Sequence, residues 1–208
     1  MNTQSPRKSQ ATQEQAVLQL LSRHGLLHTR DIAALGVPTV VLTRLTRAGK
    51  LERTGRGVYA LAGAQGSAQR SLAEVALRAP RAVICLLSAL NVHEVGTQLP
   101  FQVWLALPPG TTPPRMDHPL RIVRMSGGSL SDGVERIRID GVDVPVFNTA
   151  KTIADCFKFR NKVGMDVALE ALREGWRARR FTMTDLEHYA GICRVQRVML
   201  PYLEAMVA

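Results

Sequence analysis

The sequence predicts an α+β protein in which an N-terminal winged helix-turn-helix precedes a mixed domain with a small sheet and a C-terminal helical bundle. Three observations support this fold class. Short helical patterns within the first 50 residues are followed by a basic hairpin with a glycine turn. Residues 101–146 then show the alternation typical of strands, and the apolar spacing from residue 148 onward is helical.

A small, polar stretch at residues 63–67 divides the chain. Its sequence, Gly-Ala-Gln-Gly-Ser, has the composition of a flexible linker. We therefore expect a polar, disordered arm over residues 1–12 and a winged helix-turn-helix DNA-binding domain over residues 13–62. An α+β domain is expected to follow the linker over residues 68–208.

The basic charge is concentrated before this linker. The whole chain carries 27 Lys and Arg against 17 Asp and Glu, a formal net charge of +10. Residues 1–62 hold 9 of these basic residues and 3 of the acidic ones, so this segment is the more basic per residue. Such a surplus favours a polyanionic partner, and its position assigns nucleic-acid binding to the first domain.

Membrane and metal functions are disfavoured by the sequence. The longest apolar run, near residues 82–90, is well short of the roughly 20 residues of a spanning helix. The N-terminal residues lack the apolar core of a secretory signal, so we expect a cytoplasmic protein. Cys85, Cys156 and Cys193 are far apart and lack metal-ligand spacing, so we expect buried free thiols, no metal and no cofactor.

Three helices are predicted in the first domain. The apolar spacing of residues 13–24 predicts a helix that ends at Gly25. Thr29 is expected to cap a short second helix over residues 30–35, and Pro38 to begin a third over residues 38–48. The last two, joined by a turn containing glycine, form a helix-turn-helix. Residues 50–61 follow as a hairpin around Gly-Arg-Gly, which is the predicted wing.

The third helix has the two faces that a DNA-reading helix needs. At 100° per residue, Val41, Leu42, Leu45 and Ala48 lie on one side and threonine and arginine on the other. Arginine can bind guanine through two hydrogen bonds, and threonine can contact a thymine methyl group. Backbone N–H groups at the start of the second helix, and basic residues of the wing, can bind phosphate. The residues expected to contact double-stranded DNA are Thr29, Arg30, Thr39, Thr43, Arg44, Arg47, Lys50, Arg53 and Arg56. The alternative is a winged helix used for protein contact, with the arginines merely solvated.

The second domain is predicted to begin with helices and to continue with strands. A helix from Ser71 should end at Pro80, and Pro201 should bend or end the last helix. Asp140-Gly141 is expected to form the turn of a hairpin, because a tight turn requires residues with positive φ. The further expected elements are an apolar helix over 82–95 and strands over 101–107, 120–125, 134–139 and 142–146.

Several of these segments resemble AbiEi-type antitoxins of type IV toxin–antitoxin systems. The stretch LLSRHGLLHTRDIAALGVPTVVLTRLTRAGKLERTGRGVYAL is similar to their N-terminal winged domain. Residues 88–93, the middle strands and residues 144–155, which include Lys-Thr-Ile-Ala-Asp, resemble their C-terminal domain. The resemblance covers about residues 13–200. It implies a repressor that binds inverted repeats in its own promoter as a monomer or weak dimer, and that counters a nucleotidyltransferase toxin without a stable complex.

Basic residues late in the chain could form a second face that binds RNA, DNA or a protein partner. Arg173, Arg177 and Arg180 recur at helical spacing and so form a stripe. The alternative is a solvated face, because Glu170 and Glu174 each lie three residues before an arginine. The residues assigned to this face or to the antitoxin activity are Lys151, Lys158, Arg160, Lys162, Arg173, Arg177 and Arg180.

An enzyme is the least favoured interpretation. Nucleotidyltransferases combine a Gly-Ser pair with a later Asp-x-Asp, and Gly128-Ser129 is followed by Asp140. However, the next acid is Asp143, and Asp140 falls in a predicted turn, so we expect a chance match with residues 127–129 in a loop. Two other hypotheses stay open: a stand-alone regulator whose second domain binds a ligand or protein, and a nucleotide-processing enzyme.

Overall fold

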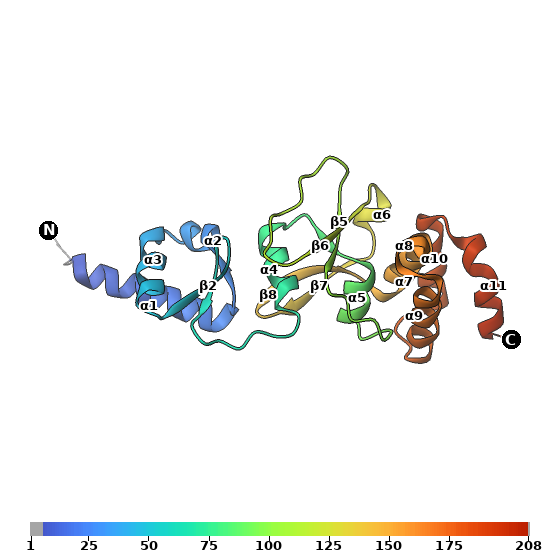
Figure 1. The fold of residues 1–208 in the computed structure, drawn as a ribbon, viewed down its shortest axis with the longest axis horizontal. Coiled ribbons are helices and arrows are strands. Elements are labelled where there is room, and N and C mark those ends of the chain that lie inside the picture. The colour runs from blue at the N-terminus through green and yellow to red at the C-terminus, as the bar shows by residue number, and fades with distance from the viewer. Residues whose placement is uncertain (1–5, 208) are drawn as a thin grey trace. The chain divides into compact units, whose positions relative to one another are not determined.

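The computed structural model describes residues 6–207 of the chain (Figure 1). The chain folds into two compact units. Unit 1 comprises Met1–Pro80 with two short later segments, Pro114–Asp117 and Arg138–Asp143, and unit 2 comprises the rest. The boundary at Pro80 lies beyond the expected linker, because helix α4 (Arg70–Arg78) belongs to unit 1.

Unit 1 is a winged helix-turn-helix, as predicted. Its three antiparallel strands lie in the order β1-β3-β2, so that the short strand β1 pairs with the wing. Helix α1 already begins at Pro6, so the expected disordered arm is wrong for residues 6–12, while residues 1–5 lie outside the described residues. The elements are α1 (Pro6–His24), β1 (Leu27–His28), α2 (Thr29–Ala34), α3 (Thr39–Arg47), β2 (Leu51–Gly55) and β3 (Val58–Leu61).

An apolar cluster between α1, α2, α3 and β2 holds unit 1 together. Its buried members are Val17, Leu21, Ile32, Val37, Val41, Leu42, Leu45 and Leu51. Ala48, which was expected on this side, is exposed, because α3 ends at Arg47 and Ala48 is its C-cap. Pro38 is likewise the N-cap of α3 and not its first helical residue.

Unit 2 contains most of a five-stranded mixed sheet in the order β6-β5-β4-β8-β7. The end of β7, the turn after it and the start of β8, Arg138–Asp143, are grouped with unit 1. Strand β4 pairs antiparallel with β5 and parallel with β8, and β5 pairs parallel with β6. Asp140 and Gly141 have positive φ, as the predicted turn of the β7–β8 hairpin requires. The strands are β4 (Val83–Ile84), β5 (Val103–Leu107), β6 (Leu120–Arg124), β7 (Val134–Ile139) and β8 (Val142–Phe147).

The single helix expected over residues 82–95 is wrong. The segment splits into β4, at the centre of the sheet, and α5 (Leu86–Val92), which starts after Cys85. Val83, Ile84 and Cys85 are all buried. A short run buried on both sides has no helical or strand periodicity, so its pattern cannot distinguish the two structures.

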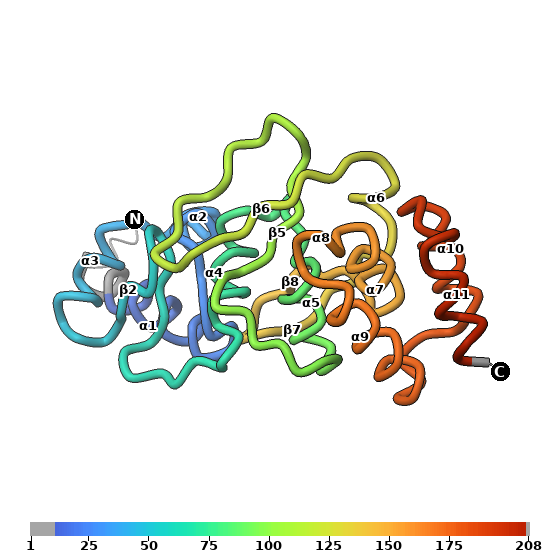
Figure 2. Tube along the Cα trace, turned by 45° about the vertical axis from the view of Figure 1, so that its right-hand side comes forward, coloured from blue at the N-terminus to red at the C-terminus, as the bar shows by residue number. Residues whose placement is uncertain are grey.

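The helices after β8 form the C-terminal bundle, which lies beyond one end of the sheet in Figures 1 and 2. Helix α7 packs against α5, α9 and α10 and is buried along nearly its whole length. Pro201 lies inside α11, which continues to Val207 and so does not end there. The bundle comprises α7 (Thr149–Lys158), α8 (Arg160–Val163), α9 (Met165–Arg177), α10 (Met183–Cys193) and α11 (Gln196–Val207).

Buried thiols were expected, and all three cysteines are free and buried. Within residues 6–207, no three His, Cys, Asp or Glu side chains are grouped so that they could hold a metal ion. Across the same range, every helix is too short or too polar to cross a bilayer.

Candidate nucleic-acid interface

Helix α3 presents a polar face with its apolar face fixed in the core. Val41, Leu42 and Leu45 are at most 2% exposed, which sets the rotation of the helix about its axis. Thr39, Thr43 and Arg47 are consequently exposed on the opposite side, as the periodicity predicts. Val40 lies beside them with 64% of its surface exposed. This face can therefore offer hydroxyl, guanidinium and methyl groups to a DNA groove.

The start of α2 is capped by His28 and not by Thr29, which corrects the predicted cap. The Nδ1 atom of His28 accepts a hydrogen bond from the backbone N–H of Arg30 at 3.2 Å. In return, the carboxylate of Asp31 accepts the backbone N–H of His28 at 3.2 Å, which completes a capping box. Histidine can serve this role only while Nδ1 is unprotonated.

Thr29 connects α2 to the wing. Its backbone N–H and its hydroxyl both donate to the carbonyl oxygen of Gly57, at 2.7 and 3.1 Å. Gly57 has a φ of +76°, and a Cβ atom at this position would lie 3.2 Å from the His28 ring. The backbone N–H groups of Thr29 and Arg30, which were predicted to bind phosphate, are thus both used by the fold, the first by Gly57 and the second by His28.

Two predicted DNA-contacting arginines are held by other parts of unit 1. The Nε atom of Arg44 lies 2.6 Å from the carboxylate of Glu14 in α1, which neutralises its charge. Arg30 donates to the carbonyl oxygen of Leu77 in α4 at 2.5 Å and approaches Asp31 at 3.6 Å. Each side chain is still about half exposed. Both therefore fit a positioning role better than base recognition.

The remaining basic residues lie on or beside the wing. Arg56 is exposed at the turn between β2 and β3, and Lys50 is exposed just before β2. Arg53 is exposed too, and its Nε donates to the carbonyl oxygen of Gly55 at 3.2 Å, which stiffens the turn. Glu52, the acid of this hairpin, is 3.4 Å from Arg70 of α4. The wing is left with a basic surface of Lys50, Arg53 and Arg56.

The position of these features in the chain coincides with a family match. Residues 15–62 match the AbiEi antitoxin family of transcriptional regulators. The resemblance predicted from the sequence is confirmed for this segment, which we call the AbiEi-like segment. It contains about half of α1, the whole of α2 and α3, and both strands of the wing.

The similarity to known folds extends beyond this segment. Among curated protein sequences, none matches the chain significantly. A similar fold is found in the crystal structure of the RV2827C protein from Mycobacterium tuberculosis, at 15% sequence identity and a TM-score of 0.56. That similarity covers 86% of this chain and 71% of the other. It concerns the fold alone, and it includes most of the chain outside the AbiEi-like segment.

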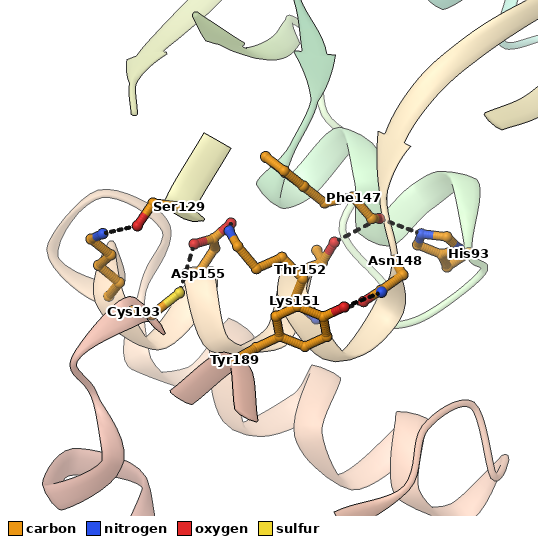
Figure 3. A network of polar contacts seen from close by, with 10 residues as sticks. His93, Ser129, Phe147, Asn148, Lys151, Thr152, Asp155, Tyr189 and Cys193 are labelled. Atoms are coloured by element: carbon orange, nitrogen blue, oxygen red, sulfur yellow. Dashed lines mark hydrogen bonds and ion pairs between the residues drawn. The ribbon is translucent and has the colours of Figure 1, made fainter. Parts of the chain in front are cut away.

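Lys151 does not belong to an exposed basic face, which corrects its assignment. Its side chain is 0% exposed, and its ammonium lies 2.5 Å from the carboxylate of Asp155, which is equally buried (Figure 3). Burial raises the pKa of Asp155, while the ammonium of Lys151 and the Sγ–H of Cys193, at 3.1 Å, counteract this rise. The Lys-Thr-Ile-Ala-Asp stretch is thus part of the core.

The buried pair lies in a network that fixes the start of α7. Asn148 caps the helix by accepting the backbone N–H of Lys151, and its amide donates to the hydroxyl of Tyr189 in α10. The carbonyl oxygen of Phe147 accepts the Thr152 hydroxyl at 3.0 Å and lies 2.7 Å from His93 Nε2 (Figure 3). These bonds join β8, α5, α7 and α10 in unit 2.

The three arginines of the predicted stripe are exposed, but only Arg173 and Arg177 lie on α9. The helix ends at Arg177 and Arg179 has a φ of +53°, so Arg180 does not continue the helical stripe. The neighbouring glutamates do not neutralise these arginines. Glu174 instead accepts the backbone N–H of Gly96 at 2.6 Å, and Glu170 accepts the N–H and hydroxyl of Thr97 at 3.2 and 2.8 Å. In the described part of the chain, Arg173 and Arg177 form no ion pair, and Arg180 approaches Glu94 only at 4.0 Å. The ion pairs of Glu170 with Arg173 and of Glu174 with Arg177, which were the argument for a solvated face, are therefore not formed.

The other basic residues assigned to this face are divided between different surroundings. Lys158 lies 3.2 Å from the Ser129 hydroxyl, and Arg160 donates to the carbonyl oxygen of Phe157 at 2.9 Å. Lys162 is exposed in α8. Beside the stripe, a depression of about 870 Å³ combines aromatic and cationic walls. Its lining residues are Trp176, Arg177, Arg179, Arg180, Phe181, Thr182, Met183 and Asp185.

The acids of the nucleotidyltransferase-like pattern are engaged by the protein. The Asp140 carboxylate accepts the backbone N–H of Ser67 at 3.1 and 3.2 Å, and Asp143 pairs with Arg138 at 2.9 Å. Gly128 and Ser129 were expected in a loop but begin the four-residue helix α6 (Gly128–Ser131). This helix does not complete a nucleotidyltransferase site, because Asp140 lies in a turn and the next acid is Asp143, which does not give Asp-x-Asp.

The histidine cap makes unit 1 sensitive to acid. Burial first, and the nearby charge of Arg30 second, lower the pKa of His28 below its usual 6.5. Because the unfolded chain then binds the proton more tightly, stability is lost as pH falls from 6.5 through this lowered pKa. We expect His28→Asn, which keeps an acceptor without titrating, to remove this loss. Thermal melts of both proteins between pH 8 and 5 measure it, and parallel curves would contradict the cap assignment.

Proposed function

We propose that this protein represses transcription by binding operator DNA with unit 1. The observation that carries the proposal is the exposed Thr39, Thr43 and Arg47 face of α3 beside a basic wing, within a segment matched by a family of transcriptional regulators. Arg47 reads a base in the major groove, and Lys50, Arg53 and Arg56 bind the phosphate backbone. The operator is an inverted repeat in the protein's own promoter, bound by a monomer or weak dimer.

The experiment is a gel-shift titration with the promoter fragment and a scrambled fragment of equal length. Arg47→Ala should weaken specific binding by roughly 1–3 kcal/mol, the worth of a bidentate guanine contact. The matched control is Arg197→Ala, which removes the same charge from exposed surface in unit 2. Equal affinity of wild-type protein for both fragments would remove the repressor proposal, whereas an unchanged Arg47→Ala would remove only the base contact.

The wing should contribute affinity without sequence preference. Arg56→Ala should weaken binding to the promoter and to the scrambled fragment by the same factor. It should also reduce the slope of log affinity against log salt by about one, because one fewer condensed counterion is released. Fluorescence anisotropy at several salt concentrations measures both quantities. A changed sequence preference with an unchanged slope would mean that Arg56 reads bases or groove shape.

We further propose that unit 2 makes the protein an antitoxin against a nucleotidyltransferase toxin, without forming a stable complex. The description of the family matched by the AbiEi-like segment supports an antitoxin, and the unneutralised arginines of α9 offer a surface for the activity. The protein acts in the cytoplasm and is not itself an enzyme. Co-expression with the product of an adjacent nucleotidyltransferase gene tests this proposal, and failure of the wild-type protein to restore growth would overturn it.

A stand-alone regulator is the second candidate. It is favoured by the depression of about 870 Å³ beside α9, which falls within the roughly 300–1,000 Å³ of small-molecule sites. In that case a small effector would change promoter affinity, and no toxin would need to be encoded nearby. An unrelated neighbouring gene together with an effector-dependent gel shift would favour this candidate.

A further inference from the structure

A second, smaller pocket in unit 2 shares no lining residue with the depression beside α9. It has a volume of about 470 Å³, within the roughly 300–1,000 Å³ typical of ligand sites. It opens where the last residue of α7 and the C-cap of α10 meet the short helix α6. Its lining residues are Ser126, Gly128, Ser129, Lys158, Ile192, Cys193 and Arg194.

The walls of this pocket carry positive charge and hydroxyl groups. Lys158 and Arg194 supply the two cations, and Ser126 and Ser129 supply the hydroxyls. The Lys158 ammonium donates a hydrogen bond to the Ser129 oxygen at 3.2 Å, so the two groups lie side by side in the pocket lining. In the described part of the chain neither cation forms an ion pair, and no carboxylate is among the lining residues. The nearby Asp132 accepts the Ser131 hydroxyl at 2.7 Å.

The floor of the pocket is polar but chemically unreactive. Cys193 lines the floor, and its Sγ–H donates to the buried carboxylate of Asp155. In Figure 3, Ser129 and Cys193 lie on the same side of the Lys151–Asp155 pair. Burial, followed by the charge of Asp155, raises the pKa of Cys193 to about 12. A thiol in this state is neither a nucleophile nor a metal ligand near neutral pH. The pocket is therefore suited to binding and not to covalent catalysis.

Arg194 occupies a backbone position that favours glycine. It is the C-cap of α10 with a φ of +58° and a ψ of +41°, in the left-handed region. Glycine is the usual residue there because a Cβ atom destabilises this conformation. The side chain at this position, however, is the one that supplies the second cation of the pocket.

We propose that this pocket binds the phosphate group of a phosphate monoester, such as a mononucleotide or the phosphorylated end of an oligonucleotide. Lysine contributes a compact charge, arginine a planar fork for two oxygens, and serine hydroxyls donate to the remaining oxygens. Two unpaired cations without a carboxylate among the lining residues favour an anion over a cation or a neutral ligand. The proposal depends only on unit 2 and not on the DNA-binding or antitoxin proposals.

Calorimetric titration of the full-length protein tests the site. The probes are AMP, adenosine, inorganic phosphate, and one short RNA with and without a 5′-phosphate. We expect AMP to bind and adenosine not to bind. Preference for the 5′-phosphorylated RNA over its unphosphorylated form would identify an oligonucleotide end as the ligand, whereas equal binding of both RNAs with tighter AMP would identify the mononucleotide. No saturable binding of any phosphate ester would overturn the proposal, as would inorganic phosphate binding while AMP does not.

Two variants locate the binding in this pocket. Arg194→Gly removes a cation while relieving the left-handed backbone, so its thermal midpoint should not fall below that of the wild type. It should weaken AMP binding at least about tenfold, as should Lys158→Met, because each removes a charged hydrogen-bond donor. The control Arg197→Ala lies in the first turn of α11, outside the lining residues. Equal weakening in all three variants would show unspecific attraction to a basic surface and would overturn the assignment.

Discussion

Lys151→Met is expected to destabilise the protein by roughly 3–5 kcal/mol, more than any other single substitution proposed for this chain. The variant leaves the carboxylate of Asp155, which is 0% exposed, without its ammonium partner. The Sγ–H of Cys193 remains, but a thiol is a weak donor. Chemical denaturation followed by circular dichroism measures the loss. Lys162→Met, at an exposed lysine of α8, is the matched control and should change stability by about 0.5 kcal/mol or less.

Two further measurements separate this explanation from simple loss of packing. The double variant Lys151→Met/Asp155→Leu should recover much of the lost stability, because replacing both members of a buried pair with apolar groups is often nearly neutral. The loss in Lys151→Met should also be smaller at pH 4.5 than at pH 7.5. Burial raises the pKa of Asp155, so at the lower pH the carboxyl can take up a proton instead of remaining charged. A pH-independent loss would point to packing alone.

Combined reversal of Arg173, Arg177 and Arg180 to Glu is expected to abolish antitoxin rescue while leaving the protein folded. The three side chains are exposed, and the neighbouring Glu170 and Glu174 are bound to the 96–97 loop, so reversal breaks no strong ion pair. Exposed helix pairs contribute at most a few tenths of a kcal/mol each. Growth of cells that co-express the toxin measures rescue, and a thermal melt checks the fold.

The control for this reversal is Arg136→Glu combined with Arg197→Glu, at exposed positions of β7 and α11. The control protein should still rescue. If the triple variant is folded and rescues like the wild type, the three arginines are merely solvated, and the antitoxin proposal has no assigned site. Loss of rescue in the control as well would show that total charge, and not the stripe, is responsible.

Local patterns predicted most of unit 1. The apolar spacing of α3 identified Val41, Leu42 and Leu45 as buried, and the glycine turn located the wing. Both predictions succeeded because each pattern is formed by residues that are close together in the sequence. The cap of α2 was assigned one residue too late. Histidine is not a usual N-cap residue, and the threonine that follows it is a common one.

The missed features depend on partners that are distant in the sequence. The ion pair between Arg44 and Glu14 joins residues 30 positions apart, and Glu170 contacts Thr97 over a separation of 73. No periodicity encodes such pairs. Lys151 was assigned to the second basic face or to the antitoxin activity, but a lysine is almost never fully buried without a partner, and this one is buried with Asp155. An acid four residues later, at Asp155 within an apolar run, was the available signal.

The two hydrogen bonds from Thr29 to Gly57 have a consequence for operator architecture. They connect the beginning of the helix-turn-helix to the tip of the wing, and pairing of β1 with β3 adds a second connection between the same parts. The spacing between a base read by α3 and a phosphate held by the wing is then set by the protein and not by the DNA. Operators that keep every base but insert one base pair between the two contact points should therefore lose binding as a whole. All operators that the protein binds would then have the same number of base pairs between the base contacted by α3 and the phosphate contacted by the wing, whatever the sequence of the intervening base pairs.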